Sequence, residues 1–120
     1  MQGTMARDMS AAMKQCAQNC TNCHNICVET LDYCLGMGGQ HVGQARLKSL
    51  LDCADTCRTS ADFMLRGSAL HTKACGLCAE ACASCAASCE KFGDDPAIKA
   101  CAEECRRCEA SCREMAKMNM

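Results

Sequence analysis

The segment from residue 75 to 89 carries five cysteines, separated alternately by three and four residues. Side chains at this spacing share one face of an α-helix, where leucine or isoleucine normally packs into a core. Thiolate sulfur is a soft ligand that selects Cu(I), Zn(II) or iron–sulfur clusters. A helix face built from cysteine therefore predicts a metal-binding seam.

The pattern CxxxCxxCxxxC occurs three times, at residues 16–27, 78–89 and 101–112. On a heptad repeat, every cysteine of the chain takes a core-facing a or d position. We therefore predict all of them as metal ligands. They are Cys16, Cys20, Cys23, Cys27, Cys34, Cys53, Cys57, Cys75, Cys78, Cys82, Cys85, Cys89, Cys101, Cys105, Cys108 and Cys112.

Two ordinary explanations of so many cysteines fit poorly. One or two buried cysteines can act as small hydrophobic residues, but a seam of sixteen would leave a bundle underpacked. A disulfide scaffold is also disfavoured, because cysteines four residues apart on one helix point in nearly the same direction. The space between the helices is therefore expected to hold metal.

Charge favours Cu(I) among the soft metals. A tetrahedral zinc site with four thiolates carries a net charge of −2, so several buried sites would be costly. One Cu(I) ion per thiolate leaves a neutral core, and a two-coordinate ion can bridge cysteines four residues apart on one helix. A zinc or cadmium buffer and an iron–sulfur or redox protein remain as alternatives, the latter because "CGLC" at 75–78 has the spacing of a redox-active dithiol.

Four helical segments position these cysteines, at approximately residues 4–35, 42–65, 68–91 and 96–117. "GMGG" at 36–39, Gly67 and "GDDP" at 93–96 interrupt the helical pattern. Asp95 is expected to cap the last helix, with Pro96 in its first turn. Short connections predict an all-α fold of one domain, residues 1–120: an antiparallel up-down four-helix bundle with a cysteine-lined core.

Antiparallel order gives the bundle two unlike ends. One end, here the Met/His end, collects five further predicted ligands: Met9, Met13, Met64, His71 and Met115. Thioethers bind Cu(I) more weakly than thiolates do, which suits an entrance.

The opposite end, here the hydrocarbon end, collects Leu50, Phe92 and Ile98 and is expected to act as a plug. Of the other histidines, His24 is expected to be half-exposed and His41 solvated. Tyr33 has no evident partner in the sequence.

Overall composition limits the other functions. The formal net charge of −1 implies neither a nucleic acid nor a membrane surface as a partner. No apolar run is long enough to span a membrane. No arrangement of a nucleophile with a general base stands out, so we expect no enzymatic activity. The first residues contain no apolar segment typical of secretion signals, which favours the cytoplasm unless a leader has been removed.

With its core-facing CxxxC and CxxCxxxC motifs, a second helix poorer in cysteine, and methionines before the first cysteine, the chain resembles the bacterial copper storage proteins. The resemblance covers nearly the whole sequence. It implies a tetramer of four-helix bundles that stores many Cu(I) ions on core thiolates and is loaded through one open end. Delivery by a copper chaperone or a small thiol is expected. The family has exported and cytosolic members; the methionine-rich entrance resembles the exported kind.

Overall fold

The computed structural model describes residues 10–118, and within that range all regular secondary structure is helical, with no strand. Four long helices are joined by short connections, and a single turn of 3₁₀-helix lies in the first connection. In chain order the elements are α1 (Ala11–Met37), η1 (Gly39–Val42), α2 (Gln44–Leu65), α3 (His71–Glu90) and α4 (Pro96–Ala116). The predicted all-α four-helix bundle is confirmed.

Side-chain caps set where the first and last helices begin. The Ser10 hydroxyl accepts a hydrogen bond of 3.1 Å from the Met13 backbone N–H, so the described part of α1 begins at Ala11. The expected start at Thr4 lies outside the described residues. At α4, the Asp95 carboxylate accepts from the Ala97 N–H, and Pro96 fills the first turn as predicted.

Glycines end helices where the sequence suggested breaks. Gly38, with φ of +68°, follows α1 and donates its backbone N–H to the Cys34 carbonyl. Gly67, with φ of +67°, lies in the turn between α2 and α3. In that turn the Ser68 carbonyl accepts from the His71 N–H, and α3 begins at His71 rather than at Ser68.

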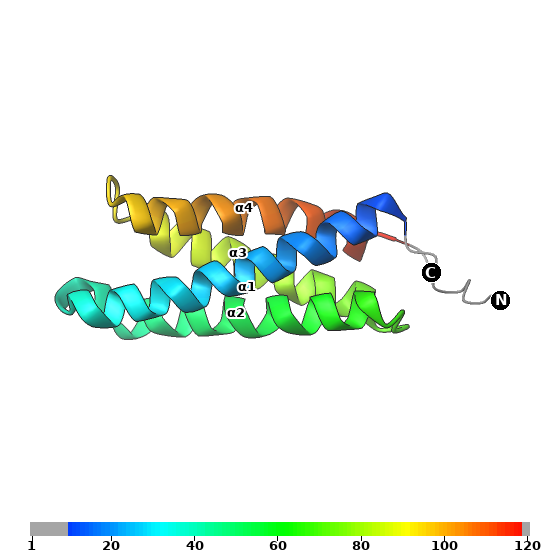
Figure 1. Cartoon of the computed structure of the whole chain (residues 1–120), viewed down its shortest axis with the longest axis horizontal. Coiled ribbons are helices and arrows are strands. Elements are labelled where there is room, and N and C mark those ends of the chain that lie inside the picture. The colour runs from blue at the N-terminus through cyan, green and yellow to red at the C-terminus, as the bar shows by residue number, and fades with distance from the viewer. Residues whose placement is uncertain (1–9, 119–120) are drawn as a thin grey trace.

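The helices run alternately up and down, and each packs against two neighbours in a closed ring: α1 on α2, α2 on α3, α3 on α4, and α4 on α1. Figure 1 shows the beginning of α1, the α2–α3 turn and the end of α4 at one end of the long axis. The α1–α2 and α3–α4 connections lie at the other end. This order brings the predicted Met/His end together from three separate parts of the chain.

Small residues let the helices approach closely. Ala79 and Ala86 on α3 and Ala102 on α4 are buried within the bundle. They are covered by the chain's own helices and so do not form an outer face of the bundle.

Candidate metal centre

All sixteen cysteine side chains are buried in the middle of the bundle, each exposed by 2% or less, and none forms a disulfide. The heptad assignment of every cysteine to a core-facing position is therefore confirmed. The thiols form a continuous column, here called the sulfur column, with few larger side chains among them. In this position ordinary bundles carry leucine and isoleucine, which fill the space through their bulk.

Sulfur atoms from all four helices meet across the column. The Cys23 sulfur of α1 lies 3.7 Å from that of Cys53 on α2 and 3.7 Å from that of Cys105 on α4. The Cys53 sulfur lies 3.6 Å from that of Cys82 on α3. Near the Met/His end, the sulfurs of Cys16 and Cys112 are 3.7 Å apart. Such distances place several soft ligands around any ion in the column.

Pairs four residues apart on one helix also face each other. Their sulfurs are separated by 4.0 Å for Cys53 and Cys57, and by 3.9 Å for Cys78 and Cys82. A small shift of either side chain would let one ion bridge such a pair, as the spacing predicted.

Groups of four sulfurs, each mutually within 4.8 Å, recur along the column and overlap. Cys57, Cys82 and Cys108, for example, each belong to two of these groups. One thiolate can therefore face more than one ion. Each tetrahedral zinc site uses four thiolates and buries a net charge of −2, which is costly along a continuous column. Overlap favours bridged Cu(I) ions. Among the groups are Cys20–Cys78–Cys108–Cys112, Cys23–Cys53–Cys57–Cys82, Cys23–Cys27–Cys53–Cys105, Cys27–Cys85–Cys101–Cys105 and Cys57–Cys78–Cys82–Cys108.

The thiols influence one another's ionisation strongly. Contact with Cys105 lowers the pKa of the Cys53 thiol, whereas contact with Cys108 raises the pKa of the Cys57 thiol. A thiol that donates a hydrogen bond stabilises its neighbour as a thiolate and itself stays protonated. The ionisation of each thiol therefore depends on its neighbours, and an arriving metal ion displaces protons from the thiols that it binds.

Cys34 lies somewhat apart from this network, toward the hydrocarbon end. Burial raises the pKa of its thiol, and the guanidinium of Arg46 opposes that rise. Cys101 and Cys85 act on it only through their charge. Burial, rather than contact with another thiol, is thus the largest influence on the pKa of Cys34.

The Met/His end is closed by the side chains that were predicted to line it. Met64 and Met115 are buried, His71 is 2% exposed, and Met13 is half-buried against the core. Met9 lies outside the described residues. The ring Nδ1 of His71 lies 3.1 Å from the Ser68 carbonyl oxygen, and Nε2 has no hydrogen-bond partner in the described chain. With the proton on Nδ1, Nε2 keeps a free lone pair for a metal.

The hydrocarbon end contains more polar groups than the sequence suggested. Leu50 and Ile98 are buried as expected, but the buried Arg46 lies beside them, its guanidinium 3.7 Å from the Phe92 ring centre. One guanidinium nitrogen of Arg46 donates to the Ser88 carbonyl at 2.9 Å. Arg46 was not predicted from the sequence as a core residue, although it lies four residues before Leu50 and so on the same core-facing side of α2.

Two further expectations at this end were wrong. His41 is not solvated: its Nε2 lies 3.3 Å from the Asp95 carboxylate, and its ring packs 4.6 Å from that of Phe92, between centres. Tyr33 does have a partner, because its hydroxyl donates to the same carboxylate at 2.9 Å. These groups tie the α1–α2 connection to the start of α4.

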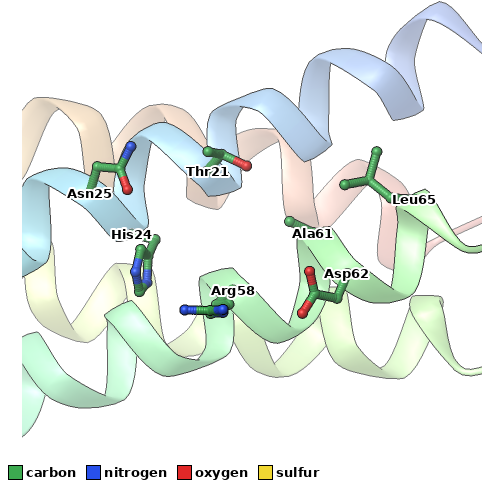
Figure 2. Close-up of a pocket in the computed structure, with 7 residues that line it drawn as sticks. All are labelled: Thr21, His24, Asn25, Arg58, Ala61, Asp62 and Leu65. Atoms are coloured by element: carbon green, nitrogen blue, oxygen red, sulfur yellow. The ribbon is translucent and has the colours of Figure 1, made fainter.

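A shallow surface cavity of about 290 Å³ lies between α1 and α2, away from the sulfur column (Figure 2). His24, Arg58 and Asp62 line it, and Figure 2 shows His24 beside Arg58. The His24 Nδ1 lies 2.8 Å from the Ala54 carbonyl oxygen, and the ring is half-buried, as expected. No thiol lines this cavity, so it is separate from the candidate metal centre.

Comparison with known protein families gives one match, to copper storage protein (Csp), over residues 9–117. The chain belongs to the copper storage protein family. A comparison with curated proteins finds no match.

Several solved structures of the same architecture are similar to this chain. The Nmul_A1745 protein from Nitrosospira multiformis is 38% identical, with 90% of this chain and 97% of that chain covered and a TM-score of 0.84. The Cu(I)-bound copper storage protein BsCsp3, from Bacillus subtilis, is 30% identical over 88% and 98%, with a TM-score of 0.82. A cytosolic copper storage protein from Streptomyces lividans, studied with five coppers, is 28% identical over 98% and 100%, with a TM-score of 0.81.

Family and geometry together establish the function. As in other copper storage proteins, the thiolates of the core cysteines store multiple Cu(I) ions. Storage of this kind is not catalytic. None of the helices in residues 10–118 combines the length and the apolar character needed to cross a bilayer.

Proposed function

We propose that all sixteen cysteines are Cu(I) ligands and that the sulfur column fills to about one ion per cysteine. The observation that carries this proposal is the continuity of the column: the overlapping groups of four sulfurs leave no natural division into separate sites. Each incoming ion displaces protons from thiols, so copper affinity falls as the pH is lowered.

Copper enters and leaves, in this proposal, through the Met/His end. Met64, Met115, Met13 and the Nε2 of His71, which has no partner among the described residues, form a layer between solvent and the first thiols. Met9, outside the described residues, remains a predicted ligand of this end. These side chains cover the column, so entry requires them to move aside while they hold the ion briefly. Thioethers suit this role because they bind Cu(I) without losing a proton and more weakly than thiolates.

The wider setting is also a proposal. We expect a copper chaperone or a small thiol to deliver the ions by ligand exchange, in the cytoplasm, to a homotetramer of single-domain chains (residues 1–120). Support for association comes from large apolar side chains left exposed on the bundle, among them Val28, Leu51 and Leu77. Light scattering of the purified protein tests the tetramer.

The central experiment is an anaerobic titration of the fully reduced protein with Cu(I) in competition with a coloured chelator. We expect tight uptake of about sixteen ions per chain. The same protein titrated with zinc serves as the control and is expected to take up far fewer ions, because each tetrahedral zinc site uses four thiolates and buries a net charge of −2. Saturation with Cu(I) at four ions or fewer would contradict the proposal.

A further inference from the structure

Ser60 occupies a core-facing position on α2 at a level where the other three helices carry cysteine. On α2 it follows Cys57 by three residues and precedes Met64 by four, so all three lie on the core-facing side of the helix. Its side chain is completely buried. The Ser60 hydroxyl has no hydrogen-bond partner within the described part of the chain, not even a carbonyl of its own helix.

The register of the helices places Ser60 in the outermost layer of thiols. The Cys57 sulfur lies 3.8 Å from that of Cys108 on α4 and 3.5 Å from that of Cys78 on α3. One turn further toward the Met/His end, α4 presents Cys112 and the antiparallel α3 presents Cys75.

The same step along α1 leads to Cys16. Cys23 contacts Cys53 at 3.7 Å, and seven residues toward the Met/His end on each of these antiparallel helices are Cys16 and Ser60. The sulfurs of Cys16 and Cys112 are 3.7 Å apart, and the Cys75 thiol interacts with both. The outermost layer thus has three thiols and one hydroxyl, directly beneath the Met/His end.

A hydroxyl and a thiol at this position have different consequences for copper. Oxygen is a poor ligand for soft Cu(I), so α2 contributes no sulfur to an ion in this layer, and the sulfur ligands come from α1, α3 and α4. When copper displaces the thiol protons, the sulfurs become thiolates, which accept hydrogen bonds. The buried Ser60 hydroxyl, unpaired among the described residues, is free to turn toward one of them, and a donor to a charged acceptor forms a strong hydrogen bond.

We propose that Ser60 makes the outermost layer the exchange layer of the store. By withholding a sulfur from α2 it keeps copper there weakly held and available to an acceptor, and by turning its hydroxyl hydrogen toward a thiolate that forms on loading it keeps the layer from emptying. This inference rests on the proposed ligand role of the cysteines and on the proposed entry through the Met/His end.

The test is a series of three proteins that differ only at this position: wild type, Ser60→Ala and Ser60→Cys. Each is loaded to saturation with Cu(I) under anaerobic, reducing conditions and mixed with excess bathocuproine disulfonate, and the first phase of copper release is followed by absorbance. Loss of the hydrogen bond in Ser60→Ala is expected to speed that phase about tenfold. An added thiolate in Ser60→Cys is expected to slow it about tenfold and to raise capacity by about one ion.

Ser84→Cys is the matched control, because it makes the same chemical change on an exposed face of α3. We expect it to release copper in the first phase as wild type does. First-phase rates that are equal in wild type, Ser60→Ala and Ser60→Cys would overturn the inference, as would faster release from Ser60→Cys. If the proposed storage function itself were wrong, wild type would saturate at four ions or fewer. That result is distinguishable from failure of the inference about Ser60. Circular dichroism confirms that each variant is folded.

Discussion

At the scale of single residues, two cysteines with the same burial differ in how many sulfurs surround them. The Cys57 sulfur lies within 4.0 Å of the sulfurs of Cys53, Cys78, Cys82 and Cys108. Cys34 makes no hydrogen bond to another thiol in the described range. In the proposed store, a thiolate at position 57 is therefore expected to bridge several ions, and one at position 34 to bind a single ion.

Replacing these cysteines one at a time should therefore change the copper content unequally. Cys57→Ala is expected to lower the content at saturation by more than one ion per chain, because each ion that it bridges loses a ligand. Cys34→Ala is expected to lower it by one ion at most. Metal analysis after gel filtration measures both, and each variant is the control for the other. Equal losses would show that the contacts along the column do not govern capacity.

The methionine sulfurs at the Met/His end should matter for the rate of loading rather than for capacity. In Met64→Leu/Met115→Leu the side-chain volume is nearly kept and only the thioethers are lost. Losing a weak ligand contact worth about 1.4 kcal/mol in the entry step slows loading about tenfold. Stopped-flow mixing with a Cu(I) donor measures this rate. Met37→Leu, at an exposed position near the opposite end, is the control and should load normally.

At the scale of helices and their connections, Asp95 holds the hydrocarbon end together. It caps α4 and accepts hydrogen bonds from Tyr33 and His41. Burial opposes ionisation of this carboxyl, but those hydrogen bonds outweigh burial and lower its pKa below the ordinary 3.8. Because the pKa is lowered in the folded state, the stabilisation is fully present above 3.8 and is lost as the pH falls through the folded-state value.

The variant Asp95→Ala should consequently melt several degrees below wild type at neutral pH. The difference between the two is expected to stay constant from neutral pH to about pH 5 and to shrink below the ordinary pKa of 3.8. Thermal unfolding followed by circular dichroism across this range measures it. Asp94→Ala, next along the chain and exposed, is the control. A difference that grows as the pH falls would contradict the role given to the Asp95 carboxylate.

At this scale the sequence predicts the features that residue spacing and local turn chemistry determine. It does not predict contacts between residues far apart in the chain. The helices and the burial of all sixteen cysteines follow from spacings of three and four residues, and the cap at Asp95 follows from local turn chemistry. The contacts that tie Tyr33 and His41 to Asp95 span 62 and 54 residues, and no spacing encodes them. The buried Ser60 fits the heptad, but its missing hydrogen-bond partner appears only in three dimensions.

At the scale of the whole molecule, the cysteines that store copper are also the residues that form the core of the bundle. The bundle has few large apolar side chains in its middle, so folding relies on helix propensity, the ends and the packing of small thiols. Any ligand that binds the folded state more tightly than the unfolded chain stabilises it, by about 4.1 kcal/mol for one site at a free concentration of 1,000 times Kd. Copper bound along the column therefore adds stability that the apolar core does not provide.

Thermal stability should consequently rise with copper content throughout the titration. We expect the unfolding midpoint to increase by at least about 10 °C between no copper and saturation. Because neighbouring groups of sulfurs share cysteines, each ion also orders ligands for the next, and the increase should be spread over the filling of the column. Calorimetry at several copper loadings under anaerobic conditions measures this. A midpoint that stops rising after the first few ions would mean that later ions bind outside the column, since only ions within it link all four helices.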